Sequence, residues 1–131
     1  MRRILVIDDE ELLRENLAAY LEDDGYQVLT TGSAESGLVK LSAFNPDLVL
    51  VDLRLGGVDG ERFVKTALGL KPGTKFIIHT GSQEYRVSEM LENLGISAGN
   101  VLYKPITDLG ILADKISELL HSPGPSLRYS Q

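Results

Sequence analysis

Five residues that can do polar chemistry stand at or just beyond the ends of short apolar runs. Asp8 and Asp9 follow the first run, Asp52 follows another, Thr80 lies beyond a third, and Lys104 follows the last. Carboxylates held together raise one another's pKa, and a divalent cation that prefers oxygen ligands removes the repulsion. Such a cation, with the ammonium and the hydroxyl, would also neutralise an incoming phosphoryl group. The residue types therefore predict metal-dependent phosphoryl transfer, provided that the fold brings these residues together.

Gly81 directly follows Thr80 and adds two properties that such a site needs. It has no side chain to crowd an arriving group, and its backbone N–H can donate a hydrogen bond to that group. A carboxylate held beside a bound cation is also a competent nucleophile. Without a cation the charges stay unbalanced, because Lys104 alone opposes three carboxylates.

Short continuous apolar runs are typical of parallel strands that are buried on both faces. Stretches with apolar residues at helical spacing separate these runs. Gly25 and residues 71–73 stand where helices would end, while Ser33, Ser82 and Thr107 could each cap the start of one. The expected strands are residues 4–7, 27–31, 48–51, 76–78 and 101–103.

Five strand–helix pairs in strict alternation indicate an α/β domain with a five-stranded parallel sheet. Right-handed crossovers join parallel strands, so helices must cover both faces of the sheet. We expect the flavodoxin-like strand order 2-1-3-4-5, a doubly wound (βα)5 sandwich. That order places the first and third strands side by side. It brings Asp8, Asp9 and Asp52 to the edge where functional groups gather in open α/β sheets.

The composition excludes several classes of function. The 131 residues suffice for one domain, expected over residues 1–121, with residues 122–131 as a linker or flexible tail rich in Pro, Gly and Ser. The net charge of −6 and the pI near 4.8 argue against nucleic-acid binding by this domain. No apolar run is long enough for a membrane span or a signal peptide, and cysteine is absent, so a soluble cytoplasmic domain is expected.

Four motifs, in this order along the chain, resemble those of one protein family. They are residues 4–10, residues 46–55 with Asp59-Gly60, Thr80, and Lys104-Pro105. Together they look like the receiver domain of two-component response regulators, over residues 3–121. The resemblance implies a phosphoacceptor switch in a phosphorelay. Such a domain catalyses only its own phosphorylation and dephosphorylation, and is not an enzyme that acts on other substrates.

The resemblance also implies how the phosphoryl group is received. Asp52 would accept it from a phosphohistidine, carried by a sensor histidine kinase or a phosphotransfer protein. Asp9 would bind Mg²⁺ (or Mn²⁺) directly and Asp8 through water, with Asp52 and the backbone carbonyl of Arg54 as further ligands. Lys104 would pair with Asp52 at first and then with the phosphoryl oxygens.

The resemblance implies a read-out as well, and here the sequence departs from its relatives. Thr80 would move toward the phosphoryl group, and the Lys104-Pro105 peptide is expected to be cis. Relatives usually carry an aromatic residue at the position of Val101, so the usual coupling of threonine to that aromatic cannot operate. Tyr103 lies two residues on and so faces the same side of the strand. We predict that it partly replaces the missing aromatic as a surface residue for partners.

Other positions near the site leave their roles open. Gly56 stands where relatives often have proline, so the loop at residues 56–60 should be looser. Arg54 and Ser82 flank the site at positions that tune dephosphorylation in the family. Glu10 is interpreted as an acid that favours the first turn of a helix, with contact to waters of the metal as the alternative. The cognate kinase, the output domain or downstream protein, and the oligomeric state (monomer or phosphorylation-dependent dimer) stay open.

Two other functions compete with a phosphoacceptor switch. Phosphatases of the haloacid dehalogenase type also use an aspartate nucleophile, threonine, lysine and Mg²⁺, but they need Asp-x-Asp after the first strand. Here Asp8 and Asp9 are adjacent and Glu10 follows, and the chain is short for a substrate cap. The other alternative is an interaction module on the same fold that works without phosphorylation. The complete set of Asp9, Asp52, Thr80 and Lys104 argues against it.

Overall fold

Alternating strands and helices make up the chain, whose computed structural model describes residues 1–55 and 58–121. The elements are β1 (Arg3–Ile7), α1 (Glu11–Asp23), β2 (Gln27–Thr31), α2 (Ala34–Phe44), β3 (Leu48–Asp52), β4 (Arg54–Leu55), β5 (Val58–Asp59), α3 (Gly60–Leu70), β6 (Lys75–Thr80), α4 (Glu89–Asn93), a 3-10 turn (Ala98–Asn100), β7 (Val101–Tyr103) and α5 (Leu109–Leu120). In the described part of the chain, no helix is long and apolar enough to cross a membrane.

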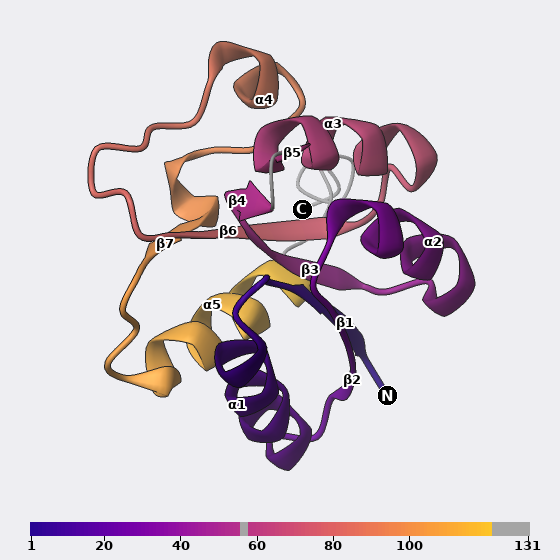
Figure 1. Ribbon diagram of the computed structural model, residues 1–131, viewed down its shortest axis with the longest axis vertical. Coiled ribbons are helices and arrows are strands. Elements are labelled where there is room, and N and C mark those ends of the chain that lie inside the picture. The colour runs from indigo at the N-terminus through magenta and orange to yellow at the C-terminus, as the bar shows by residue number, and fades with distance from the viewer. Residues whose placement is uncertain (56–57, 122–131) are drawn as a thin grey trace, which may run out of the picture.

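Five of the strands form one parallel sheet in the order β2-β1-β3-β6-β7. This is the predicted flavodoxin-like order, and the predicted fold class is confirmed. Helices α1 and α5 cover one face of the sheet, and α2, α3 and α4 cover the other (Figure 1). The register pairs Asp52 with His79 and Thr80 with Tyr103. The residues that end these strands therefore lie along one edge of the sheet.

The core consists of two apolar layers, one on each face of the sheet. Alternate residues of β1 point into different layers: Ile4 and Val6 pack with α1 and α5, whereas Leu5 and Ile7 pack with α2 and α3. Strand β3 is buried along its whole length. Its continuous apolar run is explained by helices on both sides, because neither face of the strand meets water.

Several predicted helix boundaries are confirmed, and the structure shows the expected physical cause at each. Gly25 follows α1 with a positive φ of 98°, a conformation that costs glycine little. The Ser33 side chain accepts a hydrogen bond from the Ser36 N–H at the start of α2. Helix α3 ends at Leu70, just before the predicted stop at residues 71–73.

The predicted starts of the last two helices are wrong. Ser82 does not cap a helix, because its N–H donates to the Thr80 hydroxyl in a tight turn. Helix α4 begins only at Glu89, where the Ser88 side chain accepts from the N–H of Leu91. Asp108, not Thr107, caps α5 by accepting from the N–H of Gly110. The carboxylate and the hydroxyl are adjacent and both are good caps, so sequence alone did not separate them.

Part of the segment predicted as a loop at residues 56–60 lies in a short strand. Strands β4 and β5 pair antiparallel, with Arg54 opposite Asp59. Gly56, the predicted source of looseness, lies outside the described residues, as do Gly57 and the predicted linker at residues 122–131. Gly60 begins α3 so close to β3 that a Cβ there would lie 2.7 Å from the Leu53 carbonyl oxygen. No larger residue fits this position without a shift of the backbone.

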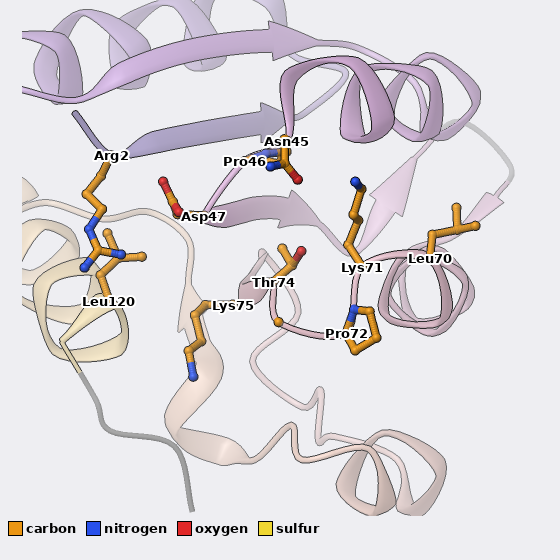
Figure 2. A pocket seen from close by; sticks show the side chains of 11 residues that line it. Arg2, Asn45, Pro46, Asp47, Leu70, Lys71, Pro72, Thr74, Lys75 and Leu120 are labelled. Atoms are coloured by element: carbon orange, nitrogen blue, oxygen red, sulfur yellow. The ribbon is translucent and has the colours of Figure 1, made fainter. Parts of the chain in front are cut away.

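A hollow of about 340 Å³ lies at the edge of the sheet opposite Asp52 (Figure 2). Arg2, Lys71 and Lys75 contribute cations to its lining, and Asp47 contributes a carboxylate. Asp47 precedes β3 whereas Asp52 ends it, so the two carboxylates lie at opposite ends of the same strand. The hollow is therefore not part of the predicted site.

His79 is a titratable residue within the core, with 2% of its surface exposed. Among the described residues, neither of its ring nitrogens has a hydrogen-bond partner. Burial, and next the charge of Lys104, lower the pKa of His79 to about 4, although Glu10 opposes the shift. The folded protein therefore holds this imidazole neutral at a pH where the unfolded chain protonates it.

This histidine makes folding sensitive to acid. As the pH falls from about 7 to about 5, His79 becomes protonated in the unfolded state but stays neutral in the folded state. The free energy of unfolding should therefore fall by about 1–2 kcal/mol. His79→Leu should reduce this loss by that amount, as measured by urea unfolding at both pH values. Other groups, including Asp52, titrate in both proteins and cancel in the comparison. An unchanged pH dependence in the variant would contradict the assignment.

Candidate functional site

Six of the predicted site residues meet in a cleft of about 600 Å³ at the carboxyl edge of the sheet, whereas Asp8, Val101 and Tyr103 do not line it. Asp52, Thr80, Gly81 and Lys104 line this cleft together with Asp9. The lining is completed by Glu10, Arg54 and Ser82. Residues from the ends of β1, β3, β6 and β7 thus converge, as the predicted strand order requires.

Lys104 is the cation around which the acidic side chains gather. Its Nζ lies 3.2 Å from Asp8 Oδ2, 3.1 Å from Glu10 Oε1 and 3.6 Å from Asp52 Oδ2. Burial alone lowers the pKa of Lys104, but the hydrogen bond to Glu10 and the charges of Asp8 and Asp52 outweigh it and raise the pKa. The lysine therefore stays charged and balances part of the negative cluster.

Asp52 is a buried carboxylate with little to neutralise it. Burial raises its pKa above the usual value, and the charges of Asp8 and Asp9 add to the effect. The hydrogen bond from the Arg54 N–H, at 3.3 Å to Oδ1, and the charge of Lys104 act in the opposite direction. On balance the pKa stays raised, so added positive charge near Asp52 would favour its ionised form.

The acidic side chains near β1 meet one requirement of a divalent cation. Carboxylate oxygens of Asp8, Asp9 and Glu10 lie within 4.8 Å of one another. Asp8 is buried while Asp9 and Glu10 are exposed, so a cation could bind and keep some of its waters. An all-oxygen donor set suits Mg²⁺ or Mn²⁺. Asp52 is outside this tight group but lines the same cleft, so the residues fit a cation held between the group and Asp52.

The bond between Glu10 and Lys104 is the site contact that sequence reasoning missed. Glu10 occupies the N-cap position of α1 without a side-chain cap, and its carboxylate bonds to Lys104 instead. Its N–H donates to Asp8 Oδ1 at 2.9 Å, which ties the two acidic residues together. Its place directly after two other acids was the available signal, but nothing local pointed to a partner 94 residues away.

Thr80 and Gly81 border the cleft in positions that suit the predicted chemistry. The Thr80 hydroxyl accepts the Ser82 N–H at 3.1 Å, and the residue itself is buried. A Cβ at Gly81 would meet no atom within 4 Å, so packing within the protein does not require glycine there. That a side chain here would crowd an arriving group stays a prediction.

The aromatic position that the family resemblance singles out is filled by an aliphatic core residue. Val101 is buried, and Tyr103 packs against the same apolar layer, so the two share a face as predicted. The Tyr103 hydroxyl donates to the Tyr85 carbonyl at 2.9 Å and accepts from Arg86 Nη1 at 3.2 Å. Tyr103 is therefore half-buried and bonded to the segment between β6 and α4.

That segment, residues 81–88, is held by neighbours on three sides. Glu61 of α3 accepts hydrogen bonds from the Tyr85 hydroxyl and from the Ser88 N–H. Gln83 Nε2 donates to the backbone carbonyl of Lys104 at 3.1 Å, and the Lys104-Pro105 peptide is cis, as predicted. We call this segment with Glu61 and Tyr103 the tyrosine clamp. It connects Thr80 to α3 and β7.

A doubly wound parallel sheet with the strand order 2-1-3-4-5 defines the flavodoxin-like class of α/β proteins. Within that class, the model of the response regulator receiver domain matches residues 4–116. The chain therefore belongs to the response regulator receiver domain family, and is a receiver domain of two-component signalling.

Two solved structures and one curated relative illustrate the similarity. A CheY-like receiver domain protein from Methanospirillum hungatei JF-1 has a TM-score of 0.79 and 30% identity, covering 92% of this chain and 94% of that chain. The response regulator TrrA from Thermotoga maritima, in complex with Mg²⁺-BeF, has a TM-score of 0.78 and 30% identity, covering 91% and 99%. The positive alginate biosynthesis regulatory protein of Pseudomonas aeruginosa is 33% identical over 106 residues, which are 79% of this chain. The match spans only 41% of the length of that relative.

The clamp can be tested through the hydroxyl of Tyr103. Tyr103→Phe removes the donor to the Tyr85 carbonyl but keeps the ring, so we expect a loss of about 0.5–1.5 kcal/mol of unfolding free energy. Amide hydrogen exchange should quicken in residues 83–88, and urea unfolding measures the stability. Tyr20→Phe is the matched control, because Tyr20 also packs partly buried against the core and its hydroxyl has no hydrogen bond within the described residues. Equal effects of the two substitutions would contradict the clamp.

Proposed function

We propose that Asp52 is the phosphoacceptor and that a phosphohistidine, on a sensor histidine kinase or a phosphotransfer protein, is the donor. A carboxylate oxygen of Asp52 attacks the phosphorus in line, and the phosphorus–nitrogen bond of the donor breaks. The imidazole leaves with the bonding electron pair and takes up a proton, and an aspartyl phosphate remains. The observation that carries the proposal is the ion pair of Lys104 with Asp52 inside a cleft that Asp9 and Glu10 also line.

The charges of the site assign a role to each neighbour. Asp9 and Asp52, with Asp8 behind them and the Arg54 carbonyl beside them, are the residues that would hold Mg²⁺. The bound ion would neutralise oxygens of the transferring group. Lys104 would bind a further phosphoryl oxygen, and the Gly81 N–H and the Thr80 hydroxyl, which belong to residues lining the same cleft, would donate to the group. These donors and charges stabilise the aspartyl phosphate once it forms.

The tyrosine clamp is the proposed route from the site to the surface. Thr80 must release the Ser82 N–H from its hydroxyl if that hydroxyl is to turn toward the phosphoryl group. The Ser82 turn begins the segment that Tyr103 and Glu61 hold, so a change at Thr80 shifts that segment relative to β7. Two arrangements of the segment would then differ in their contacts with the phosphoryl group, which is what a population shift requires.

The phosphoacceptor can be identified with a small acyl phosphate as donor. With Mg²⁺, the wild-type protein should gain the mass of one phosphoryl group, and base should remove it. Asp52→Asn should abolish this adduct, and so should chelation of the metal. Asp47→Asn is the control, because Asp47 directly precedes the other end of β3 and, within the described residues, its side chain accepts a hydrogen bond only from the Arg3 N–H.

Three results would contradict the proposal. They are an absent adduct on the wild type, an undiminished adduct on Asp52→Asn, and a loss in Asp47→Asn as large as in Asp52→Asn. Repeated turnover of a small phosphate ester would instead favour a phosphatase.

A further inference from the structure

The Lys104 ammonium lies closer to two other carboxylates than to Asp52. The distances are 3.1 Å to Glu10 and 3.2 Å to Asp8, against 3.6 Å to Asp52, and only the first two are hydrogen bonds. Before phosphorylation, the lysine is thus directed toward the β1–α1 turn. It must change partners to meet a phosphoryl group on Asp52.

The backbone around Lys104 is fixed, so this change falls to the side chain. The Lys104 N–H donates to the Thr80 carbonyl at 2.6 Å, and its own carbonyl accepts from Gln83. On the other side, the Glu10 N–H holds the Asp8 carboxylate at 2.9 Å. Two anchored backbones therefore face each other, and the flexible lysine side chain lies between them.

Glu10 is the partner that Lys104 can leave most easily. The Asp8 side chain is 3% exposed and that of Asp52 8%, whereas that of Glu10 is 63% exposed. A carboxylate in water is readily solvated when its cation leaves, while a buried one is not. Asp8 would keep its contact, and Glu10 would give up the ammonium to the arriving phosphoryl oxygens.

We propose that Glu10 is a positioning residue that holds Lys104 in its resting arrangement and competes with the phosphoryl group for it. The inference rests on the proposed function of Asp52. As a consequence, Glu10 destabilises the phosphorylated state by the free energy of one exposed ion pair. Glu10 thereby influences how tightly the phosphoryl group is bound, although it does not contact that group.

The test is binding of beryllofluoride, a stand-in for the phosphoryl group, at saturating Mg²⁺. Calorimetry suits the measurement, since the chain has no tryptophan to serve as a fluorescent probe. Glu10→Gln removes the charge, and Glu10→Asp keeps the charge but withdraws it by about 1.5 Å, one carbon–carbon bond. Both variants should bind beryllofluoride about two- to fivefold more tightly than the wild type, the worth of an exposed ion pair.

Two controls separate the contact from the general charge of the site. Glu11→Gln removes the adjacent acid, which is exposed and does not contact Lys104, and it should bind like the wild type. Saturating Mg²⁺ is the second control, because it keeps a change in metal affinity out of the comparison. A merely structural role of Glu10 would not tighten beryllofluoride binding.

The outcomes also separate this inference from the proposed function. If Glu10→Asp binds beryllofluoride like the wild type, the effect is one of charge alone and the inference is overturned. The inference is also overturned if neither Glu10 variant differs from the wild type in its affinity for beryllofluoride. It is overturned as well if Glu11→Gln binds beryllofluoride as tightly as the Glu10 variants do. If the wild type fails to bind, or Asp52→Asn binds as well as the wild type, the proposed function fails instead.

Discussion

The structure depends on one electrostatic constraint: several carboxylates must lie close together in a half-buried cleft with a single ammonium among them. Burial raises the pKa of Asp52, and the charges of Asp8 and Asp9 add to the shift. Only a rigid frame can hold them there, because flexible side chains would separate. The central position of β1 and β3, buried on both faces, supplies that rigidity. Gly60 adds to it, since α3 can begin against the end of β3 only without a side chain.

The same constraint explains why the surroundings of Lys104 are more elaborate than one ion pair. A lysine shared by three carboxylates is stabilised in its charged form but committed to none of them. Its backbone is bonded to Thr80 on one side and to Gln83 on the other. Lys104 is therefore connected through its backbone to residues 81–88, the segment that leads to α4. Tyr103 supplies a second connection one residue before the lysine, and Val101 fills the core where an aromatic was expected.

The chain order of the strands and the identity of the strand-end residues were predictable because both follow from local sequence. Apolar runs mark buried strands, and topology rules then decide which ends meet. The start of α4 was not predictable, since Glu61, from another helix, bonds to residues 85 and 88 and competes with helix formation there. Glu10 was missed for a similar reason: its partner is distant in sequence, and no periodicity reports such a contact. The roles of Asp8, Asp9, Arg54 and Asp52 as metal ligands rest on chemistry and on family resemblance.

The separation of Asp8 from Lys104 by 96 residues bears on how the domain folds. The strand with Lys104 at its end, β7, forms an outer edge of the sheet and closes the longest loop of the site. Any partly folded sheet without β7 would place the acids of β1 and β3 together before their counter-charge arrives. Such intermediates are penalised by repulsion, which favours folding in a single cooperative step. The acidic cluster that forms the site in the native state thereby also destabilises partly folded states.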